Sequence, residues 1–397
     1  MGLVMMAEDN YFILGGIDSR DYDMVVSCDD AFNMPERDID TFEVPGRNGE
    51  LIVDNGRFKN IGITYNIVIE KNFPERISAF KRAIGALRGY ARLEDTFDLE
   101  TYRMANVSKV RIDELGTRYN GGAIELTVEC MPQKFLKSGE NEIPVWFPVI
   151  TKKSESGETY DMMYSGDFKF WGYIGKTISM TVYCPQETTV TVEWNSLNQF
   201  VTAIDTQTED CTNGQTVQMT FAPTCIYGNI ILKADDIDGV YAVLDCFVVR
   251  GDDLDEETPC RIQMVDELIL SNPTGYVARP LFEFSGFKVV DLSVNNYIDN
   301  VVSESYRVKC LEDAPGTVTM LSKVYLDCDL MYMHDGNGVN LSSYLRITTA
   351  TDRSGRNLVF PEFGADTIKL KSTAAPDSEM NPEWLPVMYI TPRWWTV

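Results

Sequence analysis

The sequence contains one histidine, His334, and this scarcity excludes several familiar classes of catalytic and metal-binding site. A single histidine cannot supply both ligands of an H-E-x-x-H zinc helix, and no serine stands in a G-x-S-x-G turn. No complete G-x-G-x-x-G run or Walker loop occurs, so nucleotide binding has no signature. We expect no catalytic residue, no metal site and no cofactor, and we interpret His334 as a surface residue in the turn Met333–Gly338.

Basic residues and long apolar runs are also scarce. Acidic residues outnumber basic ones by 60 to 35, which gives a formal net charge of −25. Binding to phosphates needs clustered Lys and Arg, so this charge argues against a DNA- or RNA-binding surface. The chain lacks a run of about eighteen apolar residues, so we expect no membrane span. The N-terminal apolar stretch has no basic flank and contains Glu8 and Asp9, a pattern unlike a signal peptide.

The nine cysteines include no C-x-x-C pair, which removes the usual zinc and redox motifs. Their odd number and wide spacing favour buried thiols in a protein made in a reducing cytoplasm. The spacing leaves one alternative open, a disulfide among Cys184, Cys211, Cys225 and Cys246.

Carboxylates are abundant, but none stands in a setting that marks a site. So many acids make accidental pairs inevitable, whereas a glycosidase needs two carboxylates that flank one bond. The run Asp235–Gly239 has the acidic spacing of a calcium loop, yet the Glu that ends such a loop is missing. We interpret this run as an acidic turn.

Residues 44–69 combine two turn clusters with a strand pattern. The clusters are Pro45-Gly46-Arg47-Asn48-Gly49 and Asp54-Asn55-Gly56-Arg57, and they bracket the apolar run Leu51–Val53. Pro presets φ for a turn, and Gly and Asn tolerate positive φ, so this stretch predicts a small β-ribbon. Apolar and smaller or polar residues then alternate over 61–69, which predicts a strand with one buried face. Ordered backbone without a catalytic group suggests assembly more than chemistry.

The remaining periodicity predicts a mainly β protein with one helix. Pro74 suits a first helical turn, apolar residues follow at helical spacing, and Gly89 provides a C-cap. Residues 142–267 contain a strand series of their own, which predicts a separate antiparallel sandwich of jelly-roll type. Residues 268–397 again predict strands, with 281–284 and 289–294 as a pair.

Four motifs resemble, in order, those of the distal tail proteins of long-tailed bacteriophages. The first is the stretch 44–69, which is similar to the family's P-G-R-N/D-G-x-L ribbon and D-x-G-R-[YF]-K-N turn. The others are the runs Gly89–Asp95, Pro132–Glu140 and Pro392–Val397. The resemblance covers roughly residues 1–141 and 268–397, and it is the main basis for a functional prediction.

The resemblance implies a structural protein of the virion at the distal end of the tail, assembled in the host cytoplasm. It would form a hexameric ring that joins the tail tube protein to the tail-associated hub protein of the baseplate. Residues 1–141 would be a ring-forming β-sandwich with one helix, and residues 268–397 a galectin-like β-sandwich. DNA would pass through an acidic lumen without specific binding. The ring-interface candidates are Pro45, Gly46, Arg47, Asn48, Gly49, Asp54, Asn55, Gly56 and Arg57.

Residues 142–267 are absent from compact family members, so the resemblance identifies them as an inserted module. Such modules often resemble carbohydrate-binding modules, and aromatic rings stack on the apolar faces of sugars. Trp171 and Tyr173 are therefore candidates for binding host cell-wall polysaccharide, with core packing as the alternative. A different function also fits the composition: a free carbohydrate-binding protein or glycan hydrolase built of β-sandwiches.

Overall fold

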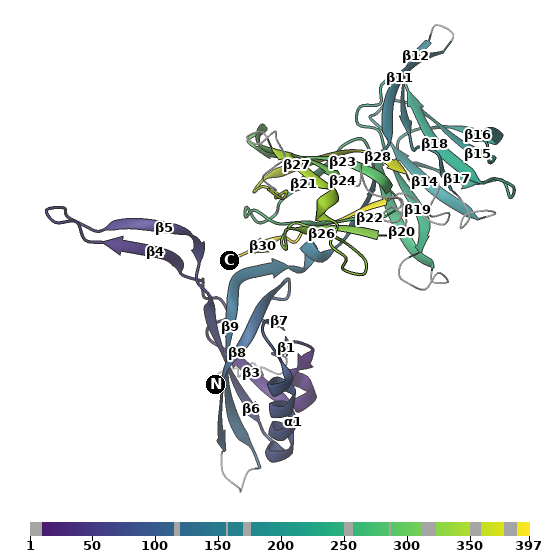
Figure 1. Cartoon of the computed structure of the whole chain (residues 1–397). Coiled ribbons are helices and arrows are strands. Elements are labelled where there is room, and N and C mark those ends of the chain that lie inside the picture. The colour runs from purple at the N-terminus through teal and green to yellow at the C-terminus, as the bar shows by residue number, and fades with distance from the viewer. Residues whose placement is uncertain are drawn as a thin grey trace. The chain divides into compact units, whose positions relative to one another are not determined.

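A computed structural model describes residues 10–114, 120–155, 158–169, 176–249, 257–285, 287–310, 323–349, 359–376 and 387–397. These residues are mainly β, with one α-helix, and this confirms the predicted fold class (Figure 1). The chain divides into two compact units. Unit 1 contains residues 1–140 and 395–397, and unit 2 contains residues 141–394.

Unit 1 is built on an eight-stranded sheet with the order β2-β1-β7-β8-β9-β6-β3, to which β30 adds by pairing with β9. In chain order its strands are β1 (Phe12–Leu14), β2 (Ile17–Asp18), β3 (Met24–Cys28), β6 (Ile61–Ile69), β7 (Ala91–Asp95), β8 (Thr101–Glu114), β9 (Gly122–Leu136) and β30 (Trp395–Thr396). Alternate residues of β6 are buried from Ile61 to Ile69, as the sequence pattern predicts. Strand β6 lies between β9 and β3. Strand β3 is the last strand of the sheet, so its outer edge is open among the described strands.

Helix α1 (Phe73–Ala86) packs on the buried face of this sheet. Pro74 occupies its first turn, where the missing N–H has no intrahelical partner to lose. Phe80 is fully buried in the core that also contains Tyr65, and its ring meets the Tyr22 ring edge to face with centroids 5.4 Å apart. The C-cap is Leu87 in extended conformation, two residues before the predicted Gly89. Short 3-10 turns occur at η1 (Ser19–Tyr22) and η2 (Lys137–Glu140).

Strands β4 (Arg37–Phe42) and β5 (Leu51–Phe58) form a separate two-stranded sheet, which we call the ribbon (Figure 1). The predicted turn at Asp54–Arg57 is wrong, because these residues lie inside β5. Ile39 pairs with Asp54 and Arg37 with Phe58, so the extra residues of β5 form a β-bulge. Gly56 supplies the positive φ of 71°, and the Asp54 carboxylate accepts its N–H at 2.8 Å.

Unit 2 contains a nine-stranded sheet. In spatial order its strands are β17 (Gln215–Thr220), β14 (Thr177–Tyr183), β19 (Tyr241–Val249), β20 (Glu257–Val265), β10 (Ile143–Trp146), β29 (Val387–Thr391), β22 (Leu281–Ser285), β25 (Lys323–Asp327) and β26 (Tyr332–Asp335). Strand β10 pairs with β20 in parallel and with β29 antiparallel. It therefore joins strands from 142–267 and strands from 268–397 in one sheet.

Two further sheets belong to unit 2. A six-stranded sheet contains β11 (Val149–Glu155), β12 (Glu158–Tyr164), β18 (Tyr227–Ala234), β15 (Val190–Leu197), β16 (Ala203–Cys211) and the short β13 (Phe168–Lys169). A five-stranded sheet contains β21 (Leu268–Ser271), β28 (Thr367–Pro376), β23 (Phe287–Ile298), β24 (Val301–Cys310) and β27 (Leu345–Thr349), and the turn η4 (Ser342–Tyr344) precedes β27. The predicted pairing of 281–284 with 289–294 is wrong, because β22 and β23 lie in different sheets. The chain changes sheets between these two strands.

The nine-stranded sheet is buried on one face at β19 and on both faces at β10 and β29. At β19, Leu244 points into the core shared with the six-stranded sheet, and Asp245 points to the opposite face. Asp245 shares its face of the sheet with Gln263 on β20. Cross-strand pairing continues this face to Val145 on β10 and from there to Met388 on β29. Both of these last residues are fully buried. One face of the sheet is therefore covered at β10 and β29 and partly exposed at β19.

Candidate functional site

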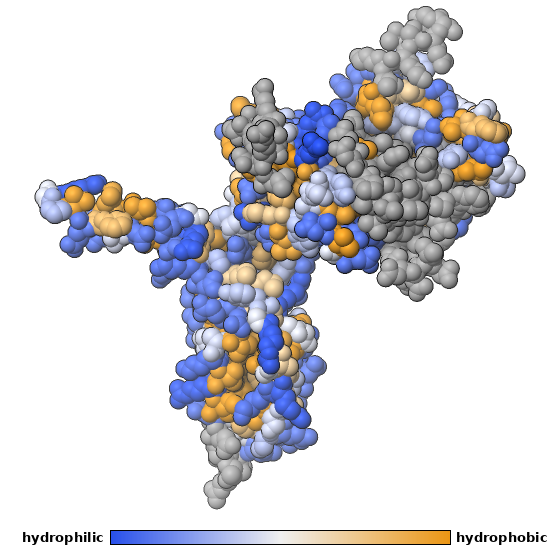
Figure 2. Space-filling model, in the orientation of Figure 1, coloured by the Kyte–Doolittle hydropathy of each residue, from blue (hydrophilic) through white to orange (hydrophobic). Residues whose placement is uncertain are grey.

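The ribbon exposes apolar side chains on both of its faces. Cross-strand pairing places Phe42 with Leu51 on one face, next to Val53, whereas Ile39 and Ile52 lie on the other. These five side chains are 40–62% exposed. Figure 2 shows hydrophobic and hydrophilic residues interleaved along its length. No other described strand pairs with the ribbon, so both of its long edges are open as well.

The predicted interface residues lie in two different parts of the ribbon. Pro45, Gly46 and Arg47 begin the loop that joins the strands, and the Arg47 N–H bonds to the Val44 carbonyl at 3.1 Å. Gly46 and Gly49 have φ of 81° and 87°, a conformation that residues with a Cβ rarely adopt. Asn48 lies in the same loop.

The second predicted cluster lies at the bulge near the base of the ribbon, where exposed ion pairs connect β4 and β5. Arg37 bonds to Asp54 at 3.0 Å, and Arg57 bonds to Asp38 at 2.6 Å. Asn55 donates to Asp40 at 3.2 Å. Exposed pairs of this kind contribute little stability, about 0–1 kcal/mol each, so they fix the pairing of the strands more than they stabilise it.

Three of the motifs that are distant in sequence meet in unit 1. Lys137 of the run Pro132–Glu140 bonds to Glu94 of the run Gly89–Asp95 at 2.6 Å. Burial raises the pKa of the Glu94 carboxyl, but hydrogen bonds from Lys137 and Arg92 outweigh it and leave this pKa below its usual value. Trp395 of the C-terminal motif pairs with Phe135 as β30 joins β9. These motifs therefore build one part of unit 1, which explains why they occur together.

The other half of the C-terminal motif belongs to unit 2. Arg393 makes a two-pronged bond to the Asp327 carboxylate, with N···O distances of 2.8 and 3.0 Å. Trp394 is buried, and its ring lies 5.7 Å from that of Phe363. Both contacts hold the C-terminal segment against unit 2 and have a structural role.

The predicted glycan-binding residues Trp171 and Tyr173 lie outside the described residues. Of the other aromatics in this region, Phe168 and Trp194 are each 2% exposed and belong to the core between the six- and nine-stranded sheets. Phe168 meets Trp146 edge to face at 5.0 Å. These two rings therefore pack the core and are inaccessible to a sugar.

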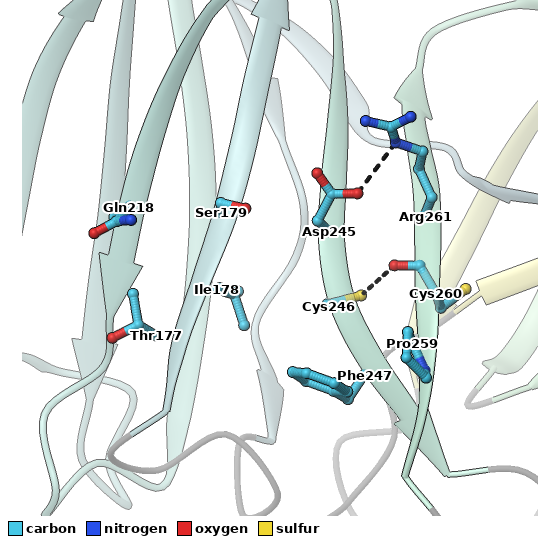
Figure 3. A pocket seen from close by; sticks show the side chains of 10 residues that line it. All are labelled: Thr177, Ile178, Ser179, Gln218, Asp245, Cys246, Phe247, Pro259, Cys260 and Arg261. Carbon is cyan, nitrogen blue, oxygen red and sulfur yellow. Dashed lines mark hydrogen bonds and ion pairs between the residues drawn. The ribbon is translucent and has the colours of Figure 1, made fainter.

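An open groove lies on the exposed face of β17, β14, β19 and β20 (Figure 3). Its volume is about 500 Å³. One polar residue from each strand lines it in a row: Gln218, Ser179, Asp245 and Arg261. Asp245 and Arg261 form an ion pair at 3.1 Å, and Phe247 lies beside the row.

The sequence analysis missed this groove because its residues have no fixed spacing along the chain. Gln218, Ser179 and Asp245 belong to the predicted strands 215–221, 178–183 and 240–249. The strand that contains Arg261, Glu257–Val265, was not predicted. The sequence does show that the outward positions of these strands are polar. Only the order of the strands in the sheet places those positions side by side.

His334 is half-buried in β26, and the prediction of a surface turn residue is wrong. Its ring stacks on Tyr325 and Tyr332 at centroid distances of 5.1 and 4.7 Å. Nδ1 lies 2.7 Å from the Asp335 carbonyl oxygen, which can only accept, so Nδ1 bears the proton. The turn begins after Asp335, and the strand pairing with β25 holds the histidine in the sheet.

Other predicted features are structural. Asp235–Gly239 is a turn in which the Asp236 carboxylate accepts the Asp238 N–H at 3.0 Å. All nine cysteines lie in described segments and none of them forms a disulfide there, and burial raises the pKa of the Cys130 thiol to about 12. Among the described residues, no cluster of His, Cys, Asp or Glu has the composition of a metal site. No helix in the described part of the chain has the length and apolarity needed to cross a membrane.

Comparisons with known proteins give matches only among solved structures, since no family model and no curated protein matches. The chain is similar to the Dit protein of phage SPP1, described as a hub adsorption apparatus in phages that infect Gram-positive bacteria. The identity is 10%, the match covers 57% of this chain and 98% of that one, and the TM-score is 0.29. The chain is also similar to a chain of the phage P2 baseplate in its activated conformation with Ca, at 8% identity, 58% and 98% coverage, and a TM-score of 0.27.

A further chain, from the same baseplate with Sr, matches at 8% identity with 58% and 99% coverage and a TM-score of 0.24. These three similar structures are phage Dit and baseplate proteins.

Proposed function

We propose that the chain is a structural, non-enzymatic protein of a phage tail tip, and that the ribbon joins its copies into a hexameric ring. The observation that supports this most is the free ribbon with apolar side chains on both faces. A two-stranded sheet without a second layer is marginally stable in water. Its exposed apolar area and unpaired edges therefore favour burial against another chain.

A second copy of the same chain is the partner that fits best. Copies related by a rotation make identical head-to-tail contacts, and such contacts close into a ring. The open edge of the eight-stranded sheet offers a receptor for the ribbon. There Val25 of β3 and Val68 of β6 form a cross-strand pair, and both are exposed. The ribbon of one copy would cover this edge of the next.

The remaining parts of the proposal follow from the sequence resemblance. One side of the ring would hold the tail tube protein and the other the tail-associated hub protein, at the distal end of the tail in the virion. Assembly would take place in the host cytoplasm. DNA would cross the lumen without specific binding, in keeping with a net charge of −25.

The proposal also divides the chain into three domains. Residues 1–141 form the ring, and residues 268–397 are a galectin-like sandwich. Residues 142–267 are an inserted jelly-roll-like sandwich that binds host cell-wall polysaccharide. The alternative is a free carbohydrate-binding protein or glycan hydrolase. A monomer that hydrolyses polysaccharide would establish that alternative.

Light scattering after size-exclusion chromatography tests the ring. The wild type should have a mass several-fold above the 44.9 kDa of one chain. Ile52→Asp places a charge on the 62% exposed ribbon residue and should reduce the mass to that of one chain. Ile269→Asp is the matched control, because Ile269 is 58% exposed on β21 in unit 2. An Ile52→Asp protein that keeps the mass of the wild type would contradict the role of the ribbon.

A further inference from the structure

The exposed face of β17, β14, β19 and β20 is a second uncovered β-surface, and its chemistry differs from that of the ribbon. The opposite face of these strands is buried in the core through Met180, Val217 and Leu244. The open face therefore rests on a packed layer and needs no partner for stability. Polar residues at these outward positions are available for a ligand.

The polar row supplies both donors and acceptors for hydroxyl groups. Gln218 offers an amide, Ser179 a hydroxyl, Asp245 a carboxylate and Arg261 a guanidinium. Neighbouring strands are about 4.8 Å apart, so four adjacent strands spread these groups over about 15 Å. The register pairs Ser179 with both Gln218 and Asp245, and Asp245 with Arg261, so all four side chains share one face (Figure 3).

Aromatic rings flank the row along the strand direction. Phe247 is 40% exposed and lines the groove two residues from Asp245 on β19. In the other direction, Tyr241 is on the same face, and its ring stacks on Tyr183 at 4.8 Å with planes 13° apart. Exposed ring faces next to hydrogen-bonding groups match a pyranose, which has an apolar C–H face and a rim of hydroxyls.

The charge of the face favours a neutral ligand. The carboxylate of Asp245 and the guanidinium of Arg261 neutralise one another, so the row has no net charge. The chain as a whole has a net charge of −25, which repels polyanions such as phosphate-linked wall polymers. A protein interface would instead need an apolar centre depleted of charges, and here the centre is polar.

We propose that this face binds a neutral hexopyranose polysaccharide, with Gln218 and Asp245 bonding hydroxyls and Phe247 stacking on a ring. The inference rests on the proposed glycan-binding role of residues 142–267 and gives that role a site. A groove of about 500 Å³ is within the range of ligand sites and leaves both ends open for a longer chain.

The test uses the full chain and an array of neutral gluco-, galacto- and manno-oligosaccharides, with poly(glycerol phosphate) and polyuronate as anionic probes. Binding to the best neutral oligosaccharide is then measured by calorimetry for Gln218→Ala and Phe247→Ala. Each should weaken binding about tenfold or more. Phe200→Ala is the matched control, since Phe200 is 77% exposed in the loop after β15 and does not line the groove. It should bind like the wild type.

The outcomes separate this inference from the functions on which it rests. Wild-type binding that both variants keep would overturn the site while leaving glycan binding intact. Absence of binding to every probe, neutral and anionic, would overturn both. Binding to the anionic probes alone would contradict the proposed ligand class. If the variants lose oligomeric mass and keep glycan binding, the face is a protein contact. The ring proposal depends on the ribbon and is judged by mass alone.

Discussion

The ribbon and the groove face are both exposed β-surfaces, but only one of them is backed by a core. Behind the groove, Leu244 and its neighbours fill a core between two sheets. Behind the ribbon no described strand or helix forms a second layer, and its apolar residues are exposed on both faces. A surface that needs no partner for stability can present polar groups to a ligand, whereas the open edges and apolar faces of an unbacked ribbon favour burial against another chain. The contrast supports the proposals of assembly for the ribbon of unit 1 and of ligand recognition for the groove of unit 2.

The largest effect should come from breaking the core of unit 1. Phe80→Ala removes a fully buried ring and should lower the free energy of unfolding by about 3–5 kcal/mol. Phe42→Ala removes an aromatic side chain of the ribbon that is 53% exposed. It should change the free energy of unfolding of the single chain by less than about 0.5 kcal/mol. Urea denaturation at a dilution where only single chains are present measures both. Equal losses would show that the ribbon is part of the core.

A smaller effect separates two Arg–Asp pairs of similar geometry in unit 2. Arg393→Ala leaves the Asp327 carboxylate, whose side chain is 7% exposed, without its cation and should cost about 3 kcal/mol. Arg307→Ala removes the same type of two-pronged bond to Asp291, but the Arg307 side chain is 58% exposed. It should cost less than about 1 kcal/mol. Thermal denaturation of both variants gives the difference, and a larger loss for Arg307→Ala would contradict the expected dependence on burial.

The smallest effect is the pH dependence that Asp327 contributes. Burial raises the pKa of this carboxyl, but bonds from Arg393 and the Leu330 and Asp329 N–H groups outweigh it, so the folded-state pKa is below 3.8. Stability from this group is therefore complete above about pH 4 and is lost as the pH falls through the lowered pKa. Asp327→Asn should lower the overall stability and should make the decrease in stability between about pH 4 and 2 less steep. Melting temperatures measured at steps across this range test it, and an unchanged acid slope would rule out Asp327 as its source.

Local features of the fold are predictable from the sequence, and long-range pairing is not. The helix beginning near Pro74 and the strand 61–69 follow from the spacing of apolar residues, which a short segment contains in full. The turn at Asp54–Arg57 fails because Gly and Asn favour a β-bulge as much as a turn. The pairing of β10 with both β20 and β29 unites residues more than a hundred positions apart, and no local period encodes it.

The candidate sites differ in the same way. The ribbon was predicted only in part: its loop and the strand around Leu51–Val53 follow from local sequence, but β4 was not predicted. The apolar residues on its faces, such as Phe42 and Ile52, were not among the interface candidates. The groove was missed because Gln218, Ser179, Asp245 and Arg261 come from four strands. Sequence patterns identify which residues point outward, and only the order of the strands shows which of them are neighbours.

A photoreactive phenylalanine analogue at position 52 tests most directly whether the ribbon joins two copies. Irradiation of the concentrated full-length protein should produce species of two or more chains, and mass spectrometry should place the link in unit 1 of the neighbour, near Val25 and Val68. Links confined to the same chain, in a sample that otherwise has the mass of an assembled ring, would show that the ribbon folds back on its own chain and would contradict the account.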